Sequence, residues 1–236
     1  MPNIINESES SRCKDRARDA EQSVVKSWYE DKTNVDDMQH WNVGKLKRWE
    51  LDVAARFPQG ARILDIGCGM GREAFALSDM GYFVTGIDIS DEVIRQVTTC
   101  AGQNGYKIPF ICYDGHSLPF EDNSFDVVII WAQTFGLLYG DSYKNEFLRE
   151  CRRVLTDGGL LSYSAHDFAY ETEHYEKYLV GRKFYPYADT ELYWETFLPD
   201  ELKYFAEAAG FSVILCDIGE IYKPEDGTIL HCLCKR

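Results

Sequence analysis

Residues 62–73 read Arg62-Ile63-Leu64-Asp65-Ile66-Gly67-Cys68-Gly69-Met70-Gly71-Arg72-Glu73, an apolar strand followed by a glycine-dense turn and the start of a helical pattern. Glycine allows the backbone to approach a ligand closely and to adopt conformations that are unfavourable for other residues. The free amides at the start of the following helix favour polar or anionic groups. The stretch therefore predicts a nucleotide-like cofactor at this turn.

The spacing of the glycines narrows the choice of ligand. The dinucleotide fingerprint places its third glycine three positions after the second, where this chain has Arg72. Here the glycines occupy alternate positions, 67, 69 and 71, and Asp65 precedes them on the strand. Asp88 ends the next predicted strand, residues 83–88, where a carboxylate can accept hydrogen bonds from both ribose hydroxyls. The pattern departs from the simplest dinucleotide site.

Residues 64–71 and the landmarks that follow them resemble the class I S-adenosylmethionine (SAM) dependent methyltransferases. The landmarks are Asp114-Gly115 before Leu118-Pro119-Phe120, Phe125-Asp126 at the start of a strand, and Arg153-Val154-Leu155 before Gly158-Gly159. The resemblance covers most of the chain from residue 60 onward and implies SAM as cofactor and S-adenosylhomocysteine as product. A dinucleotide site and a purely structural glycine turn are the alternatives, because such a motif counts only in its strand-turn-helix context.

The order of elements predicts an α/β fold with a doubly wound, seven-stranded, mostly parallel sheet, flanking helices and an antiparallel last strand. Strands are expected over residues 62–66, 83–88, 109–113, 125–131, 159–164, 211–216 and 228–234, and helices over 72–80, 91–101, 142–155 and 199–209. Residues 1–20 read as a flexible tail and 21–236 as a single methyltransferase domain. Within that domain, residues 21–60 form an N-terminal helical cover, and residues 166–197 form an aromatic substrate insertion after strand five.

The composition limits the partners. The 236 residues carry a formal net charge of −14, which opposes the basic surface that phosphate backbones require, so we expect no nucleic-acid substrate. No apolar run reaches the length of a membrane span, and the N-terminal residues lack the layout of a secretory signal. We therefore expect a cytoplasmic protein without a membrane partner. Its partner is expected to be a small-molecule methyl acceptor, and the rings of the insertion also allow a homodimer contact.

The eight cysteines are expected to be mostly buried structural thiols, because free cysteine is commonly buried. Cys232 and Cys234 are the closest pair, but they lie in an alternating strand, and no second cluster has zinc-finger spacing. The five histidines are scattered. No metal site is predicted.

The resemblance implies a role for each of ten cofactor-binding residues. The turn backbone would pack against the methionine and ribose, Asp65 would hold the ammonium, and Asp88 would hold the ribose hydroxyls. The remaining residues would contact the adenine or lie beside the methyl group. The full set is Asp65, Gly67, Cys68, Gly69, Asp88, Ile89, Asp114, Gly115, His116 and Trp131. Asp114 could instead be a turn-forming aspartate, and His116 could be an ordinary loop histidine.

No dedicated catalytic motif is present, as expected when positioning supplies most of the rate. His166 and Gln133, near strand ends, and Tyr29, in the N-terminal cover, are the catalytic candidates, although each could simply be packed or solvated. The chain has neither the Asn/Asp-Pro-Pro-Tyr type of segment after strand four nor a Pro-Cys pair, so nucleic-acid bases are unfavoured as acceptors.

The insertion is rich in aromatic rings with interleaved acids, which favours an aromatic acceptor or an amine held by cation-π contact. A lid or dimer contact is the alternative reading. We therefore expect methyl transfer to an amine, hydroxyl or carbon of a small molecule by in-line displacement. Thiol or metalloid methylation and a catalytically silent SAM-binding regulatory module remain alternatives.

Overall fold

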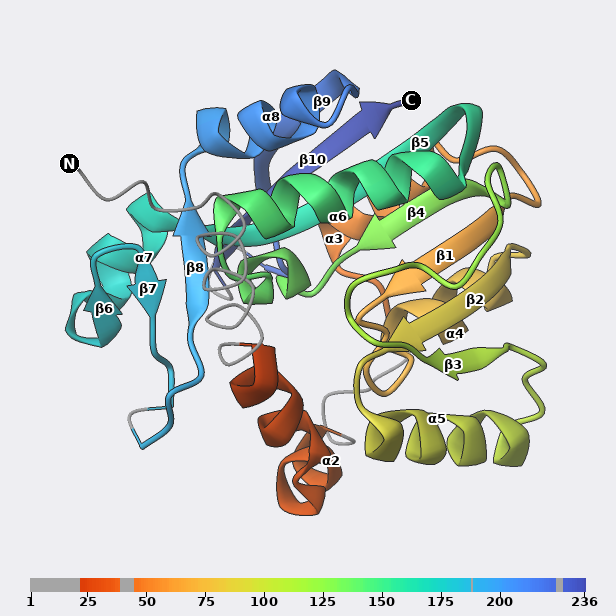
Figure 1. Ribbon diagram of the computed structural model, residues 1–236, viewed down its shortest axis with the longest axis horizontal. Helices are drawn as coiled ribbons and strands as arrows, with labels where there is room; N and C mark the ends of the chain where they lie inside the picture. The colour runs from red at the N-terminus through yellow and green to blue at the C-terminus, as the bar shows by residue number, and fades with distance from the viewer. Residues whose placement is uncertain (1–21, 39–44, 188, 224–226) are drawn as a thin grey trace, which may run out of the picture.

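The computed structural model describes residues 22–38, 45–187, 189–223 and 227–236. The tail expected over residues 1–20 lies outside this part of the chain. Residues 22–30 are helical, and two short helices follow before the sheet, α2 (Lys32–Met38) and α3 (Arg48–Ala54). Figure 1 shows the sheet, with the carboxyl ends of its parallel strands directed toward the side on which α2 lies.

The sheet has the strand order β3-β2-β1-β4-β5, and beyond β5 it continues through β10 to β9. These strands are β1 (Arg62–Ile66), β2 (Phe83–Asp88), β3 (Phe110–Cys112), β4 (Phe125–Ile130), β5 (Leu155–Asp167), β9 (Ser212–Glu220) and β10 (Thr228–Lys235). The first five pair in parallel, and β10 is antiparallel to both of its neighbours. The chain reverses its direction of winding between β1 and β4, the place where open α/β sheets bind ligands.

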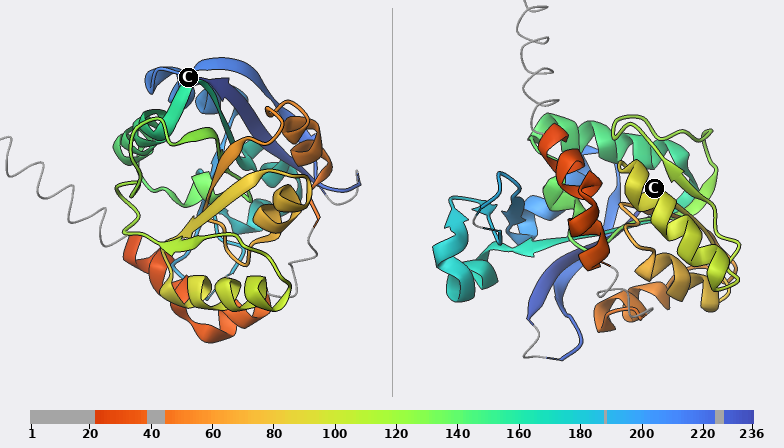
Figure 2. Two further views of the ribbon diagram at one scale, coloured as in Figure 1. Left: turned by 90° about the vertical axis from the view of Figure 1, so that its right-hand side faces the viewer. Right: turned by 90° about the horizontal axis from the view of Figure 1, so that it is seen from below.

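Helices cover both faces of the sheet, as Figure 2 shows. They are α4 (Arg72–Asp79), α5 (Asp91–Gln103), α6 (Asp141–Val154) and α8 (Pro199–Ala208). Successive strand residues face opposite helices: Leu64 packs in the cluster with residues of α6 and α8, and Ile63 packs with α3 and α4. Both side chains are fully buried. This explains why the strand sequences are apolar nearly throughout.

The local signals for helix starts are also realised. Ser90 caps α5, because its Oγ accepts a hydrogen bond of 3.2 Å from the amide of Val93. The same hydroxyl donates to the carbonyl of Tyr29 over 2.8 Å. The cap therefore also ties residues 22–30 to the end of β2, beside the glycine turn.

The doubly wound fold with its seven expected strands is confirmed. Among the described residues, the insertion adds three short strands, β6 (Leu179–Val180), β7 (Lys183–Phe184) and β8 (Trp194–Phe197), which bring the sheet to ten, with α7 (Phe168–Tyr175) between β5 and β6. The insertion lies at the left of Figure 1. β8 pairs in parallel with the end of β5, His166 opposite Thr196. Strand five therefore extends three residues beyond its expected end and carries His166.

The expectation of free thiols is wrong for one pair of cysteines. Cys216 and Cys232 lie directly opposite each other on β9 and β10, with their Cα atoms 4.2 Å apart, and form a disulfide. Register, which a linear sequence does not display, brings them together. The other five cysteines of the described ranges are free.

Candidate active site

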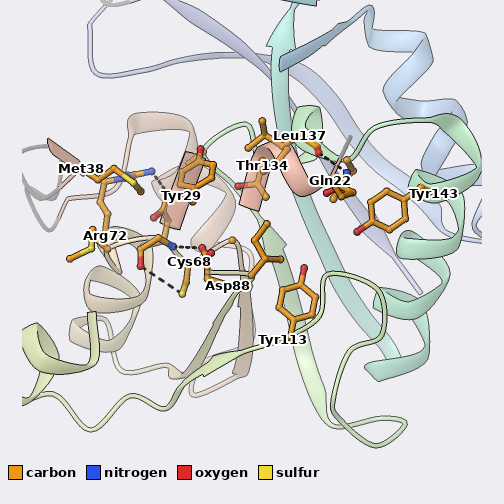
Figure 3. A pocket seen from close by; sticks show the side chains of 18 residues that line it. Gln22, Tyr29, Met38, Cys68, Arg72, Asp88, Tyr113, Thr134, Leu137 and Tyr143 are labelled. Carbon is orange, nitrogen blue, oxygen red and sulfur yellow. Dashed lines mark hydrogen bonds and ion pairs between the residues drawn. The ribbon is translucent and has the colours of Figure 1, made fainter. Parts of the chain in front are cut away.

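The glycine turn is tied to the end of β2 by three backbone amides, and a fourth amide, that of Ser90, orients the Asp88 side chain. The amides of Gly67 and Cys68 donate to the carbonyl of Ile87 over 2.9 and 3.0 Å. The Asp88 carboxylate accepts from the amides of Gly69 and Ser90, 3.1 Å each, one at each oxygen. Each oxygen thus retains acceptor capacity for a ligand. Figure 3 shows Asp88 and Cys68 side by side in the cavity.

Gly67 shows why this turn requires glycine. Its φ is +70°, in the left-handed region, and a Cβ there would lie 2.6 Å from the Cγ2 of Thr134. Thr134 begins η2 (Thr134–Leu137), the 3-10 turn that follows β4. The absence of a side chain therefore lets the loop after β4 close over the turn after β1.

Asp65 is buried just behind this turn. Its side chain is 2% exposed, and its Oδ2 has no hydrogen-bond partner among the described residues. Burial, followed by the nearby Glu73, raises the pKa of the Asp65 carboxyl well above its usual range. A buried acceptor without a donor is unfavourable, so this oxygen is prepared for a ligand that brings a hydrogen-bond donor or a positive charge.

Next to Asp65, Arg72 is held by two carboxylates. Its Nη1 and Nη2 each donate to Glu50 over 2.7 Å, Nη2 also contacts Glu73, and Nη1 reaches the carbonyl of Lys45 at 2.9 Å. Glu50 is fully buried. The bidentate pair joins the start of α4 to α3 and leaves Arg72 with its charge neutralised.

The first cavity, of about 190 Å³, opens at this turn. Its walls come from residues 22–30, α2, the glycine turn, the ends of β2 and β3, η2 and α6. Five predicted cofactor residues and one catalytic candidate line it: Gly67, Cys68, Gly69, Asp88, Ile89 and Tyr29. Burial, and then the charge of Asp88, raises the pKa of the Tyr29 hydroxyl, which keeps it a hydrogen-bond donor.

Asp65 and three predicted residues of the loop after β3 do not line this cavity. The exposed Asp114 accepts at Oδ1 from the amides of His116 and Ser117, over 2.8 and 2.9 Å, which closes the turn. Gly115 is buried, and its carbonyl accepts from the hydroxyl of Tyr143, which does line the cavity. Tyr113, which directly follows β3, lines the cavity, whereas Gly115 supports it only through its contact with Tyr143.

Trp131 is also turned away from the cavity. Its Nε1 donates to the Ser162 hydroxyl over 2.8 Å, and its ring packs edge-on to Trp49 at 5.3 Å. The two residues after it face the site instead. Ala132 and Gln133 have φ values of 50° and 61°, which are unusual for residues other than glycine and concentrate at functional sites.

A second cavity, of about 810 Å³, adjoins the first. Four residues line both: Tyr29, Met38, Arg72 and Ala132. Its aromatic walls are Trp28, Tyr187, Phe184 and Trp194, from the N-terminal helix and the insertion, and Gln133 and His166 also line it. All three predicted catalytic candidates therefore lie in this one cavity, although more than a hundred residues separate Tyr29 from His166.

His166 is paired with a buried carboxylate. Its Nδ1 lies 3.0 Å from Oε1 of Glu171, whose side chain is nearly buried and whose Oε2 has no hydrogen-bond partner among the described residues. The ring packs edge-on against Phe184 and Trp194. The contact assigns the proton to Nδ1, so Nε2 carries the lone pair.

The acids of the insertion do not surround this cavity as expected. Of the acids expected to favour a cation, only Asp189 lines it. Glu195 pairs with the buried Lys144, and Asp167 caps α7 by accepting from the amide of Ala169 over 3.0 Å. These carboxylates support the fold of the insertion, so the structure does not present an acidic pocket for an amine.

Several lining residues were not singled out from the sequence. They are Tyr113, Thr134, Leu137, Leu138 and Tyr143 in the first cavity and Lys47 in the second, whereas Phe184 and Trp194 of the second cavity belong to the rings expected in the insertion. Tyr143 reads only as one apolar position of a helix. Thr134 carries a local signal, because it follows strand four at the switch point of the sheet.

None of the helices in the described ranges is both long and apolar enough to cross a membrane. Within the same ranges, no three His, Cys, Asp or Glu side chains are grouped as a metal site requires.

Comparison with known proteins agrees with this geometry. Residues 63–159 match the family described as methyltransferase domain. A ubiquinone biosynthesis O-methyltransferase of Caulobacter sp. (strain K31) is 35% identical over 118 residues, which are 49% of this chain and 45% of that protein. This chain thus spans about half the length of such curated relatives.

Solved structures extend the likeness to most of the chain. A SAM-dependent methyltransferase from Methanosarcina mazei is 25% identical with a TM-score of 0.69, covering 78% of this chain and 96% of that one. A 1,6-didemethyltoxoflavin N1-methyltransferase from Burkholderia thailandensis, solved with its acceptor and S-adenosylhomocysteine, has a TM-score of 0.65 at 17% identity and covers 100% of this chain and 92% of that one. With the glycine turn, the acid-ended strands and the sheet order, these matches show that residues 63–159 resemble a methyltransferase domain and that the chain has the fold of the class I SAM-dependent methyltransferases.

Proposed function

We propose that this chain binds SAM in the first cavity and transfers its methyl group to a hydroxyl of an aromatic small molecule in the second. The observation that carries the proposal is the His166–Glu171 pair in a ring-lined cavity that joins the glycine turn. A base matters most where the nucleophile is a protonated hydroxyl or amine. Of the insertion acids expected to favour a cation, Asp189 alone lines the cavity among the described residues, so a hydroxyl is preferred over an amine.

The residues of the first cavity fit the cofactor. Asp65 lies behind the glycine turn and does not line the cavity, but its partnerless Oδ2 suits the methionyl ammonium, and the two oxygens of Asp88 keep acceptor capacity for the ribose hydroxyls. The left-handed glycines leave room for close approach of the ligand to the turn. When bound there, SAM supplies an electrophilic methyl group on a sulfonium.

Within the second cavity, the chain itself has two tasks. The aromatic walls position the acceptor, which contributes most of the rate in a displacement between two bound reactants. His166 accepts the hydroxyl proton at Nε2, while Glu171 holds the ring through Nδ1 and stabilises the imidazolium that forms. The phenol of Tyr29, kept protonated, and the amide of Gln133 are available to orient the acceptor.

The other readings have less support. Thiol or metalloid methylation would use a thiolate near the acceptor, but no cysteine of the described residues lines the second cavity. Cys68 lines the first, where burial raises the pKa of its thiol well above the usual range. A silent SAM-binding module would not need a paired histidine at the junction with the acceptor cavity. A homodimer contact through the insertion remains a prediction.

The test uses labelled SAM with a set of phenols and catechols, read by mass spectrometry of the products. His166→Ala is expected to lower kcat about a hundred- to ten-thousand-fold and to leave the Kd for S-adenosylhomocysteine unchanged. His174→Ala, which changes an exposed histidine on α7 of the same insertion, is the matched control and should retain activity. Transfer to a hydroxyl by His166→Ala at the wild-type rate would contradict the proposed base.

A further inference from the structure

Lys47 is a cation in the wall of the second cavity, close to its junction with the first at Arg72, and the proposed mechanism does not use it. It lies immediately before α3 and lines the second cavity beside Arg72, which lines both. Its side chain is half-buried. Among the described residues, its ammonium makes no hydrogen bond or ion pair. The Lys47 ammonium is therefore a partly buried charge without a counter-ion among the described residues.

Arg72, although it lies at this junction, is poorly placed to bind an anionic ligand. Both of its terminal nitrogens are already engaged by Glu50, Glu73 and the carbonyl of Lys45. A guanidinium whose terminal nitrogens are engaged in this way, and whose charge is offset by two carboxylates, contributes little to a further anionic ligand. Among the described residues that line the second cavity, Lys47 is the other lysine or arginine.

Burial lowers the pKa of Lys47, with the nearby Glu50 opposing the shift. Such a shift shows that the charged form has lost hydration without gaining a hydrogen-bonded counter-ion. A ligand carboxylate at this position would supply that counter-ion, and the low polarity of the surrounding aromatic walls would strengthen the contact.

We propose that Lys47 is a carboxylate-binding residue of this active site. The inference rests on the proposed function and deepens it, because two carboxylates can reach a junction between donor and acceptor cavities. One is the amino-acid carboxylate of the methyl donor, and the other is a carboxylate borne by the aromatic acceptor. The chemistry at Lys47 is the same in both cases, and binding measurements separate them.

The experiment compares calorimetric affinities of the wild-type chain with those of Lys47→Met and Lys47→Arg. The donor arm uses S-adenosylhomocysteine and 5′-deoxy-5′-methylthioadenosine, which keeps the nucleoside and thioether but lacks the amino-acid carboxylate. The acceptor arm, at saturating S-adenosylhomocysteine, uses 3,4-dihydroxybenzoate and its neutral amide. Lys45→Met, at an exposed lysine two residues away, is the matched control.

In one of the two arms, Lys47→Met is expected to weaken the carboxylate ligand by about tenfold or more, because a charge-assisted hydrogen bond is lost. The neutral counterpart should keep its affinity, Lys47→Arg should retain most of the preference, and Lys45→Met should change neither ligand. A loss in the donor arm assigns the donor carboxylate, and a loss in the acceptor arm assigns an acidic acceptor.

The proposal is overturned if Lys47→Met changes no carboxylate ligand, or if it weakens each carboxylate ligand and its neutral counterpart equally, as a structural role would. Thermal unfolding establishes that the variants are folded, and Lys47→Gln takes the place of Lys47→Met if the latter is not. A wild-type chain that binds neither nucleoside refutes the proposed function, and with it this inference. Normal binding with an indifferent Lys47 refutes the inference alone.

Discussion

Replacing Asp88 by asparagine should remove most of the affinity for S-adenosylhomocysteine. In the structure, one carboxylate oxygen accepts from the Gly69 amide and the other from the Ser90 amide, 3.1 Å each, and the side chain is 7% exposed. The remaining acceptor capacity is what the ribose hydroxyls would use. An asparagine has only one acceptor oxygen. Its NH2 would face either a backbone amide or a ribose hydroxyl, and both of these groups are donors that need an acceptor.

The expected loss follows from the two hydrogen bonds to a charged group. Each contributes about 1.5–3 kcal/mol, so their removal costs roughly 3–6 kcal/mol, or a hundred- to ten-thousand-fold in Kd. Titration calorimetry measures it directly. Asp91→Asn, the same change at an exposed position at the start of α5, should bind as the wild type does.

Asp88 also supports the turn, so affinity alone does not isolate the ribose contact. A 2′-deoxy analogue of S-adenosylhomocysteine completes a thermodynamic cycle: removing the hydroxyl should weaken binding to the wild type but have much less effect on Asp88→Asn. A coupling energy of about 1 kcal/mol or more is expected for a direct hydrogen bond. No coupling, or unchanged binding in a folded Asp88→Asn, would refute the ribose assignment.

Other predictions concern stability as well as binding. Asp65→Asn should raise the Tm of the ligand-free protein by about 2–4 °C at pH 7, for a gain of about 1 kcal/mol, while weakening S-adenosylhomocysteine. Because the native pKa of Asp65 is raised, the folded state binds more protons than the unfolded state, so stability falls as pH rises above about 4. Thermal scans at several pH values should show a shallower fall of Tm in Asp65→Asn than in the wild type. Equal slopes of Tm against pH would contradict the burial argument. Glu195→Gln leaves the fully buried Lys144 without its partner and should cost about 3 kcal/mol in urea unfolding, whereas a loss below about 1 kcal/mol would show that the pair is dispensable. Gly67→Ala places a Cβ 2.6 Å from a methyl of η2 at φ +70°, so it should lose more stability than Gly81→Ala, whose φ is +90° with open space around it; equal Tm losses would exclude the steric cause.

The central strands and the first cavity were largely predictable, because their signals are local. Gly67 and Asp65 stand together in one strand-turn-helix unit, and Asp88 ends the next strand by the same pattern. Parallel strands that share an edge bring such ends together without further information. Strand five was predicted too short, because its final residues pair with β8, which a scan for periodicity does not anticipate.

Side-chain direction was the first property that local sequence could not supply. Trp131 and Ala132 are neighbours at the end of β4, yet the indole donates into the sheet toward Ser162 while Ala132 lines both cavities. In the same way, Asp114 closes its own turn and leaves the cavity wall to Tyr143 from a helix. Packing against residues distant in the sequence decides these side-chain orientations, because the strand propensity of a residue depends strongly on its packing context.

The local sequence therefore predicted the methyl-donor site at the first cavity, whereas only the tertiary structure revealed the acceptor site at the second cavity. The glycine turn and Asp88 need only backbone geometry over a few residues to form their site. The second cavity joins Trp28, Lys47 and His166, which are far apart in the chain, and it depends on Glu171 turning toward His166. Such contacts form only when the N-terminal helix and the insertion fold against the same edge of the sheet, and no local pattern encodes that meeting.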